Sequence, residues 1–413
     1  EVPRLPEPPT LAVPSELAAE GHRFLRPTSL AELLIARRAH PEAVIVAGAT
    51  ELAVTRNLRG VAPTTLISVA DVGELSFVRT TSDAIVIGAS TTLTDLHASL
   101  GEHLPMLRTM LESFGARTIR NLATIGGNLA TASPISDLLP VLLALDARLV
   151  LESAERGERI VPVEDFLVGY RKTSLARDEV IVRVAIPLPE ARHAGLDLHG
   201  FVRKVGKRHE LDIATANVAF FVAREPGTGR VVHARLAFGG VAETSVRARR
   251  TEEVLVGRRL DPAVVAEALT VLDGELHPID DVRGHATYRK RLALRLFERF
   301  AAEVVGTLEP FPSDPPGFGR GAPDDRADPS RSVTPDARLH ATGEADFTDD
   351  LARKRPMLEV VPVLAPHAHA RIRALDLGAA RAMPGVVAIL TASDIPGENN
   401  AGGIRHDEPV LAK

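Results

Sequence analysis

The stretch that decides the fold reads ATIGGNLATASPISD and covers residues 123–137. It brings two glycines, one asparagine and four hydroxyl-bearing residues together in fifteen positions, directly before an apolar run. Backbone N–H groups and hydroxyls in such number, with few charges, suit a pyrophosphate or a polyhydroxylated cofactor chain. The same residues also fit a long structural turn in which Ser136 and Asp137 begin the next helix, and composition alone leaves both interpretations open.

A second turn lies upstream, where residues 46–52 read VAGATEL. An apolar strand at 43–47 leads into small residues, and a helix is expected to begin near Thr50. Small residues let the backbone approach a ligand closely, and the N-terminus of a helix attracts a phosphate. Because the stretch holds a single glycine, a plain strand–turn–helix corner fits it as well.

The composition is that of an ordinary globular chain and excludes several classes of protein. The 413 residues are 45% apolar and 25% charged, with a net charge of −5. A chain of this length is expected to form roughly two or three domains. No apolar run reaches the roughly 18 residues of a membrane-spanning helix, and no basic excess points to nucleic acid. Because cysteine is absent, the chain holds neither a disulfide nor a cysteine-ligated iron–sulfur cluster.

Short strands and helices alternate along the chain, which predicts an α+β architecture. Proline-rich segments at 1–21 and 306–337 are interpreted as an extended arm and an inter-domain linker. Between them, the alternation of polar and apolar residues around glycine-containing turns predicts two hairpins, at 148–163 and 217–239.

Taken together, the two turns resemble the FAD-binding domain of the molybdenum hydroxylases, the family of xanthine dehydrogenase, aldehyde oxidase and carbon monoxide dehydrogenase. The resemblance implies a two-subdomain, PCMH-like FAD-binding domain at 22–190, followed by an α+β flavoprotein C-terminal domain at 195–305. In this family the pyrophosphate of FAD lies on the two turns. The residues that would line it are Val46, Ala47, Gly48, Ala49, Thr50, Glu51 and Leu52 from the first turn, and Ala123, Thr124, Gly126, Gly127, Asn128, Thr131, Ser133 and Asp137 from the second.

Four further residues match family positions around the cofactor. Phe114 matches an aromatic ring that stacks on the adenine, although a core phenylalanine at a helix end fits it too. Lys204 aligns with a lysine that faces the flavin, where a cation would stabilise the negative charge of the reduced ring. Asp212 aligns with an acid on the same loop, and Ile181 with an apolar residue packed against the ring. Most charges of the stretch 201–214 also fit a solvated loop that leads into a strand.

The end of the chain resembles the opening of the molybdopterin-binding part of the same family. Residues 338–413 are therefore expected to form the N-terminal part of an α/β hammerhead domain. His367 and His369 alternate along an expected strand, so both could face one metal ion. No third ligand follows them, and we predict no metal site.

The resemblance also implies partners and cofactors for the chain. Electrons would reach FAD from a molybdopterin centre and 2Fe-2S clusters on other segments or subunits, and would leave to NAD+ or oxygen. We expect no catalytic acid or base in this chain, no nucleic acid or membrane as partner, and a cytoplasmic dimer of assembled units. The chain then corresponds to the middle of a longer polypeptide, which joins the flavin part to the molybdopterin part.

The stretch SPISD at 133–137 and the tail at 396–409 favour hypoxanthine or xanthine as the substrate of the whole enzyme. Two alternatives stay open. One is the flavin segment of another molybdenum hydroxylase, acting on an aldehyde, carbon monoxide or an N-heterocycle. The other is a cofactor-free scaffold that docks neighbouring domains, against which the intact sequence at 126–128 argues, because a scaffold has no use for it.

Overall fold

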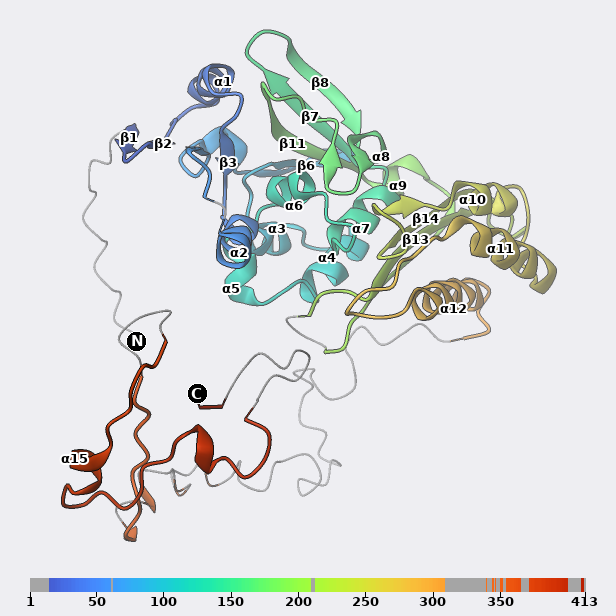
Figure 1. Cartoon of the computed structure of the whole chain (residues 1–413). Coiled ribbons are helices and arrows are strands. Elements are labelled where there is room, and N and C mark those ends of the chain that lie inside the picture. The colour runs from blue at the N-terminus through green and yellow to red at the C-terminus, as the bar shows by residue number, and fades with distance from the viewer. Residues whose placement is uncertain are drawn as a thin grey trace. The chain divides into compact units, whose positions relative to one another are not determined.

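A computed structural model describes residues 15–60, 62–208 and 212–308, together with residues 339, 344, 346, 350–351, 354–364, 371–399 and 410–411. The chain divides into two compact units, Glu1–Gly319 and Arg320–Lys413 (Figure 1). The first unit carries every residue expected to contact the cofactor.

The first unit begins with a small four-stranded sheet of order β1-β2-β4-β3. Its elements are β1 (Glu16–Ala19), β2 (His22–Leu25), α1 (Leu30–Ala39), β3 (Val44–Val46), α2 (Thr50–Arg59) and β4 (Thr65–Ser68). Residues 16–19 were expected in the proline-rich arm, but they form β1 because they pair with β2 as an antiparallel hairpin. The sequence predicts Ser29 as a helix N-cap, because Glu32 follows three residues later. In the structure, Ser29 caps α1 by accepting a hydrogen bond from the amide of Glu32 at 3.2 Å.

A second, fully antiparallel sheet follows, with the order β5-β6-β11-β7-β8. Its strands are β5 (Val78–Thr80), β6 (Ala84–Gly88), β7 (Arg148–Ser153), β8 (Gly157–Pro162) and β11 (Glu179–Pro187). The hairpin predicted at 148–163 is the pair β7–β8. The helices between β6 and β7 are α3 (Leu93–Ser99), α4 (Pro105–Glu112), α5 (Arg117–Arg120), α6 (Ile125–Thr131) and α7 (Leu138–Ala144). Short elements complete this part: η1 (Gly73–Leu75), α8 (Val163–Phe166), β9 (Leu167–Gly169), β10 (Lys172–Thr173) and α9 (Pro189–Arg192).

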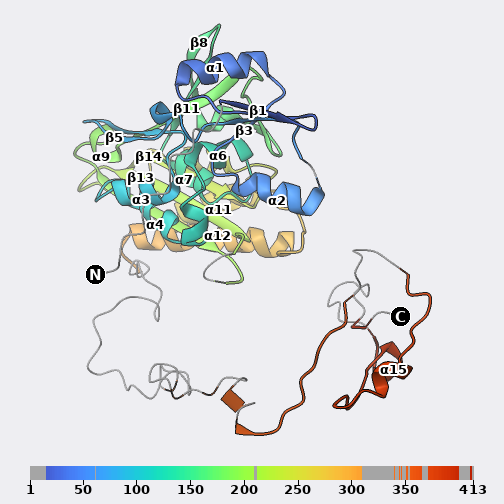
Figure 2. The same cartoon turned by 90° about the vertical axis from the view of Figure 1, so that its left-hand side faces the viewer.

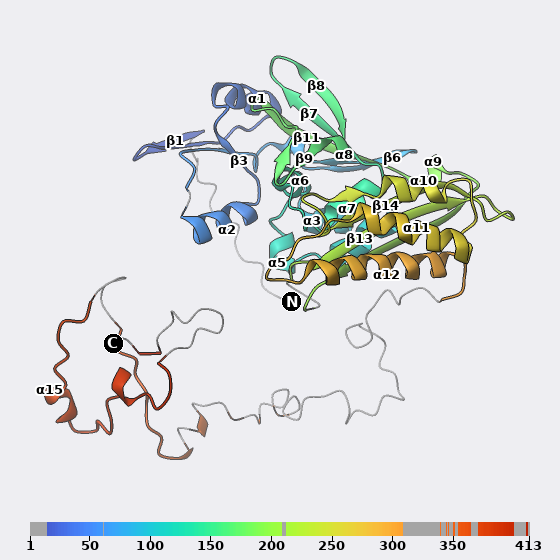
Figure 3. The same cartoon turned by 45° about the vertical axis from the view of Figure 1, so that its right-hand side comes forward.

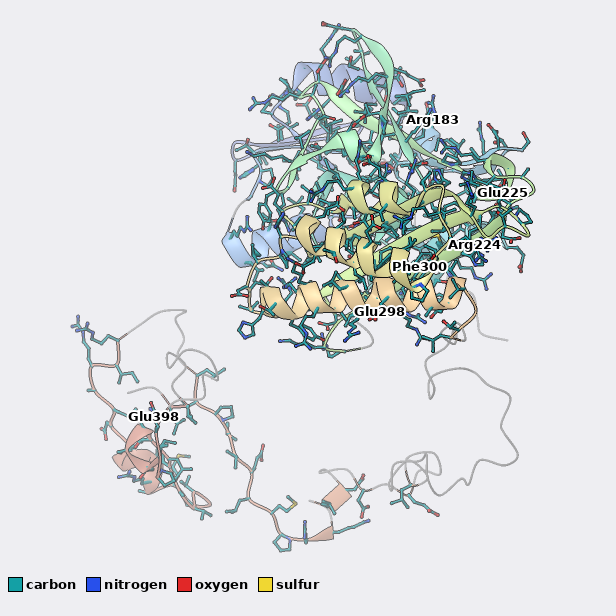
Figure 4. The ribbon with its side chains drawn as sticks, turned by 90° about the vertical axis from the view of Figure 1, so that its right-hand side faces the viewer. Arg183, Arg224, Glu225, Glu298, Phe300 and Glu398 are labelled. Atoms are coloured by element: carbon teal, nitrogen blue, oxygen red, sulfur yellow. The ribbon has the colours of Figure 1, made fainter. Side chains whose placement is uncertain are left out.

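The third layer is a meander of order β12-β13-β14-β15. Its elements are β12 (Asp197–Val205), β13 (Ala216–Arg224), β14 (Val231–Gly239), β15 (Val246–Arg247), α10 (Arg249–Leu255), α11 (Pro262–Glu275) and α12 (Ala286–Val304). The hairpin predicted at 217–239 is the pair β13–β14. Helices α10, α11 and α12 cover one face of this sheet (Figure 3), where a phenylalanine cluster forms the core. Phe300, labelled in Figure 4, lies in this cluster with its ring 5.4 Å from that of Phe220.

Helix α7 covers the other face of the third sheet, although it belongs to the part of the chain that precedes that sheet. All seven of its residues are buried, and it contacts both β13 and β14 as well as α4. A helix that is apolar all round is stable in water only when it is enclosed on every side. The sequence Leu138–Ala144 therefore joins the two halves of the unit into one core.

The second unit contains α15 (Gly378–Arg381) and η2 (Ala392–Asp394), which begins with a capping box between Thr391 and Asp394. The apolar run 357–364 is exposed along its length. His367 and His369 lie outside the described residues. Across the ranges that the structure describes, no helix combines the length and the apolar composition needed to cross a membrane.

Candidate cofactor-binding site

The two turns singled out in the sequence touch each other in the fold. A Cβ atom built on Gly48 would lie 1.6 Å from the carbonyl oxygen of Leu122 and 3.1 Å from the amide nitrogen of Ala123. Only glycine permits this approach. The contact brings the end of β3 against the turn between α5 and α6, and α2 lies at the edge of the unit (Figures 1 and 2).

The N-terminus of α2 is open. Ala49 precedes the helix with a left-handed backbone (φ 56°) and supplies no side-chain cap. Within the described part of the chain, the amides of Thr50, Glu51 and Leu52 have no hydrogen-bond acceptor. Unpaired amides at the positive end of a helix dipole bind a phosphate group. This end of α2 can therefore hold an anion without disturbing any internal bond.

The N-terminus of α6 is closed, in contrast to that of α2. The sequence predicted a loop over this stretch, but residues Ile125–Thr131 form a helix because acceptors are present for each first-turn amide. Ile125 donates to the carbonyl of Thr91 at 3.2 Å, Gly126 to that of Ala89 at 2.9 Å, and Gly127 to Oγ1 of Thr124 at 3.1 Å. These amides are thus not free for a ligand.

Helix α6 instead presents a polar edge made of residues from the second turn. Gly127 is exposed, and Asn128, Thr131 and Ser133 are half-buried. The hydroxyl of Thr131 donates to the carbonyl of Gly127 at 2.9 Å. Ala123, Thr124 and Gly126 are buried beneath this edge, so they shape the site without facing solvent.

Phe114 lies beyond the end of α4, half-buried and packed against the main hydrophobic core. Its carbonyl accepts a hydrogen bond from Nη1 of Arg120 at 2.7 Å, which closes the turn between α4 and α5. The sequence did not single out Arg120. Phe114 is therefore compatible with both interpretations: it contributes to the core, and it is only partly buried.

Lys204 and Asp137 form a buried ion pair between the two halves of the unit. Nζ of Lys204 lies 2.6 Å from Oδ2 of Asp137 and donates to the carbonyl of Ser113 at 3.1 Å. Only 7% of the lysine side chain and 10% of the aspartate side chain are exposed. Burial raises the pKa of Asp137, and Lys204 and Asn217 oppose that rise only in part. The expectation of a solvated loop holds for Lys207 and Arg208 but is wrong for Lys204, which lies in β12.

Asp212 and Ile181 lie apart from this pair. Asp212 accepts hydrogen bonds from the backbone amides of Lys207 and Arg208, the latter at 2.9 Å. These donors lower the pKa of Asp212, so it is a fixed negative charge held by the backbone that follows β12. Ile181 is 9% exposed in β11 and packs into the main core.

Two residues that the sequence analysis missed hold the site together. The hydroxyl of Ser136 donates to Oδ1 of Asn128 at 2.7 Å, and Nδ2 of Asn217 donates to the carbonyl of Ser136 at 2.9 Å. The one available signal for Asn217 is its polarity within the apolar run 216–223. The sequence indicates Ser136 only as a possible start of a helix and as part of the stretch SPISD.

The opposite end of α7 holds a dense cluster of charges. Asp146, left-handed at φ 52°, lies 2.9 Å from Nη1 of Arg192 and 2.7 Å from Nε of Arg235. Burial raises the pKa of Asp146, but these arginines outweigh it and the net pKa falls below its ordinary value. A cavity of about 270 Å³ opens here, lined also by Arg247 and Glu164. Within the described ranges no group of His, Asp or Glu could hold a metal ion.

Three family models match the chain. Residues 19–189 match the FAD binding domain in molybdopterin dehydrogenase, and residues 201–304 match the CO dehydrogenase flavoprotein C-terminal domain. Residues 342–413 match the a/b hammerhead domain of aldehyde oxidase and xanthine dehydrogenase. The chain belongs to the molybdenum hydroxylase family and carries its FAD-binding segment. The resemblance and the fold class inferred from the sequence are thereby confirmed.

Solved structures from the molybdenum hydroxylase family share this fold. Carbon monoxide dehydrogenase from Hydrogenophaga pseudoflava superposes with a TM-score of 0.62 at 30% identity, over 67% of this chain and 94% of that one. Quinoline 2-oxidoreductase from Pseudomonas putida 86 gives a TM-score of 0.62 at 29% identity, over 69% of this chain and 96% of that one.

Curated relatives of this molybdenum hydroxylase segment extend well beyond it. Nicotinate hydroxylase hnxS from Emericella nidulans is 34% identical over 98% of this chain and 32% of its own length. The xanthine dehydrogenase/oxidase of Gallus gallus is 31% identical over 96% of this chain and 32% of its own length. The chain thus spans about a third of the length of these relatives.

The residues present fit FAD. Among the described residues, three amides at the N-terminus of α2 have no acceptor, and they suit the pyrophosphate. The α5–α6 turn, which leads into the polar edge of α6, touches the first turn through the Gly48–Leu122 contact. A buried cation, Lys204, is held beside the turn that carries Phe114. Anion-binding amides, hydroxyls, an aromatic ring and a fixed cation are the groups that a flavin dinucleotide requires.

Proposed function

We propose that this chain is the FAD-carrying electron-transfer segment of a xanthine dehydrogenase-like molybdenum hydroxylase. In that role it takes electrons from iron–sulfur clusters and passes them to NAD+, or to oxygen, while the whole enzyme hydroxylates hypoxanthine or xanthine. FAD, when bound, supplies the change from single-electron uptake to hydride release. The family assignment and the xanthine dehydrogenase relatives support this proposal.

The observation that carries the proposal is the open N-terminus of α2, packed against the α5–α6 turn. The amides of Thr50, Glu51 and Leu52 would bind the pyrophosphate, together with the polar edge of α6 at Gly127 and Asn128. The remaining residues predicted from the sequence would surround the rest of the cofactor. They are Val46, Ala47, Gly48, Ala49, Phe114, Ala123, Thr124, Gly126, Thr131, Ser133, Asp137, Ile181, Lys204 and Asp212.

The chain's own charged residues would set the electrostatics of the site. Lys204 is fixed by Asp137 and by the carbonyl of Ser113, so its ammonium group cannot swing into solvent. A preorganised cation in a buried position stabilises negative charge much more strongly than one in water. Asp212, held ionised by backbone amides, would add a fixed negative charge beyond β12.

A second candidate substrate is another N-heterocycle such as nicotinate. The observation in its favour is that the nicotinate hydroxylase relative is 34% identical, against 31% for a xanthine dehydrogenase. In either case the partners would be an iron–sulfur domain and a molybdopterin-binding domain in a dimer of assembled units, and the cytoplasmic location remains a prediction. Turnover of the complete enzyme on hypoxanthine, nicotinate and an aldehyde distinguishes these substrates.

The test of FAD binding is the substitution Gly127→Val. A Cβ atom at Gly127 would lie 3.0 Å from Oγ1 of Thr124, a tight contact that the threonine side chain must relieve by moving a few tenths of an ångström. The new side chain would block the exposed polar edge. We expect Gly127→Val to abolish FAD retention with little loss of stability. The matched control is Gly73→Val, where nothing lies within 4 Å of a Cβ atom. FAD affinity of Gly127→Val equal to that of the control would remove α6 from the site.

A further inference from the structure

Asn217 is a fully buried polar side chain that the family resemblance did not assign. It lies in β13, at 0% exposure, directly opposite Lys204 of β12 and Gly239 of β14. Residues opposite each other in antiparallel strands point to the same face of the sheet. Asn217 and Lys204 therefore both face α7, and both reach the aspartate at its N-terminus.

The two oxygens of Asp137 are divided between these neighbours. Oδ2 pairs with Nζ of Lys204 at 2.6 Å, and Oδ1 lies 3.4 Å from Nδ2 of Asn217. The same Nδ2 donates to the carbonyl of Ser136 at 2.9 Å. Because both groups around Nδ2 are acceptors, the orientation of the carboxamide is fixed by chemistry.

The other end of the carboxamide shows what this arrangement costs. Oδ1 of Asn217 is buried and has no hydrogen-bond partner among the described residues. It packs over Gly239, where a Cβ atom would lie only 2.0 Å away. A buried, unsatisfied carbonyl is unfavourable, so the contacts made by Nδ2 must outweigh it. The glycine leaves room for this side chain.

Through Ser136 the contact extends to the polar edge of α6. The carbonyl of Ser136 accepts a hydrogen bond from the side-chain amide of Asn217, and the hydroxyl of Ser136 donates one to Oδ1 of Asn128. One side chain of the C-terminal domain thus contacts Asp137 of the Lys204–Asp137 pair directly and is linked to the α6 edge through Ser136.

We propose that Asn217 is a positioning residue of the cofactor site, whose carboxamide holds Asp137 and Ser136 so that the Lys204 ammonium group and the Asn128 edge of α6 keep one fixed arrangement. This rests on the proposed function, because it concerns the same FAD site. Asn217 acts through its neighbours and is not placed against the cofactor.

The test uses Asn217→Leu in the full 413-residue chain. Loss of one donor, with buried acceptors left unpaired, is expected to weaken FAD binding about tenfold. The substitution also removes a donor that favours the ionised form of Asp137. Among the described residues, Lys204 is the one charged side chain in ion-pair contact with Asp137. Any pH-linked change in the visible spectrum of bound FAD should therefore move to higher pH.

Two further variants separate positioning from a general loss of stability. Asp137→Asn should abolish the pH-linked spectral change, and adding Asn217→Leu to it should then move nothing further. Thr251→Val is the matched control, since it deletes the 2.6 Å hydrogen bond from the buried Thr251 of α10 to Glu275 of α11, on the opposite face of the same sheet. It should lower stability and leave both FAD affinity and the pH profile unchanged.

Asn217→Ser serves if the leucine variant fails to fold, because its hydroxyl is too short to reach Asp137. Suppose that the wild-type chain binds FAD, and that Asn217→Ser or Asn217→Leu matches Thr251→Val in FAD affinity and pH profile. That result would overturn the positioning role of Asn217 and leave the proposed function standing. A wild-type chain that takes up no FAD would overturn the proposed function and this inference with it.

Discussion

The two ends of helix α7 are built from the same kind of residue and behave in opposite ways. Asp137 at the N-terminal end has one cation, Lys204, and lies deep in the protein. Asp146 beyond the C-terminal end has arginines on several sides and lies next to a cavity. Burial dominates at Asp137, whose pKa is raised, whereas the arginines dominate at Asp146, whose pKa is lowered.

The difference indicates that the two ends of α7 have different roles. A helix favours an anion at its N-terminus and cations at its C-terminus. Asp137 follows that rule, whereas Asp146 opposes it and is compensated by Arg192 and Arg235. The C-terminal end uses many charges to join two domains, at the expense of a left-handed aspartate. The N-terminal end uses the Lys204–Asp137 pair, which joins two of the residues predicted to surround the cofactor.

The largest expected effect comes from breaking the buried pair. Asp137→Leu leaves the Lys204 ammonium group buried without a partner, which should lower the free energy of unfolding by about 3 to 5 kcal/mol. Adding Lys204→Met should restore most of it, because an apolar pair of similar volume is often neutral in such a position. Urea denaturation measures both. A single variant within about 1 kcal/mol of the wild type would contradict the burial of the pair.

An intermediate effect is expected at the C-terminal end on acidification. Burial lowers the pKa of His233 to about 4, with Arg235 adding to the shift. Because this pKa lies below its ordinary value of 6.5, the stability that neutral, buried His233 contributes is complete above pH 6.5. It is lost as pH falls toward 4. The pKa of Asp146 is also lowered, so Asp146 likewise makes the protein less stable as pH falls. The pKa of Asp137 is raised, so Asp137 has the opposite effect and makes the protein less stable as pH rises.

The variant His233→Phe keeps an aromatic ring beside His193, whose ring lies 4.5 Å away, and removes the titration. Between pH 7 and 4.5 the wild type should lose more unfolding free energy than this variant, by about 1 to 3 kcal/mol. Denaturation curves at the two pH values measure the difference. Equal losses would show that His233 is protonated in the folded protein.

The smallest effect is expected at an exposed ion pair of the site. Nη1 of Arg171 lies 2.6 Å from Oε1 of Glu51, with 36% and 44% of the side chains exposed. Arg171→Ala should change the unfolding free energy by no more than about 1 kcal/mol, because solvent screens such pairs. Thermal denaturation checks this. A loss as large as that of Asp137→Leu would mean that pairing, and not burial, sets the difference between the ends of α7.

Patterns that depend on local sequence were predicted correctly. The hairpins β7–β8 and β13–β14 and the Ser29 cap of α1 follow from alternation, turn residues and capping chemistry. Features that depend on tertiary partners were not. Helix α6 needs acceptors from Thr91 and Ala89, which are distant in sequence, so its glycine-rich stretch indicated a loop.

The candidate site shows the same division. The sequence indicated Lys204 and Asp137 separately, through their family positions, but nothing local predicts that they pair across 67 residues. Asn217 was missed because a lone polar residue in an apolar strand has no defined meaning until its cross-strand neighbours are known.

The most direct measurement is the visible absorption spectrum of the purified full chain, followed by release and identification of its chromophore. Binding of FAD through the open end of α2 and the edge of α6 predicts a flavin spectrum and FAD at about one per chain. A colourless chain that also fails to take up added FAD would contradict it.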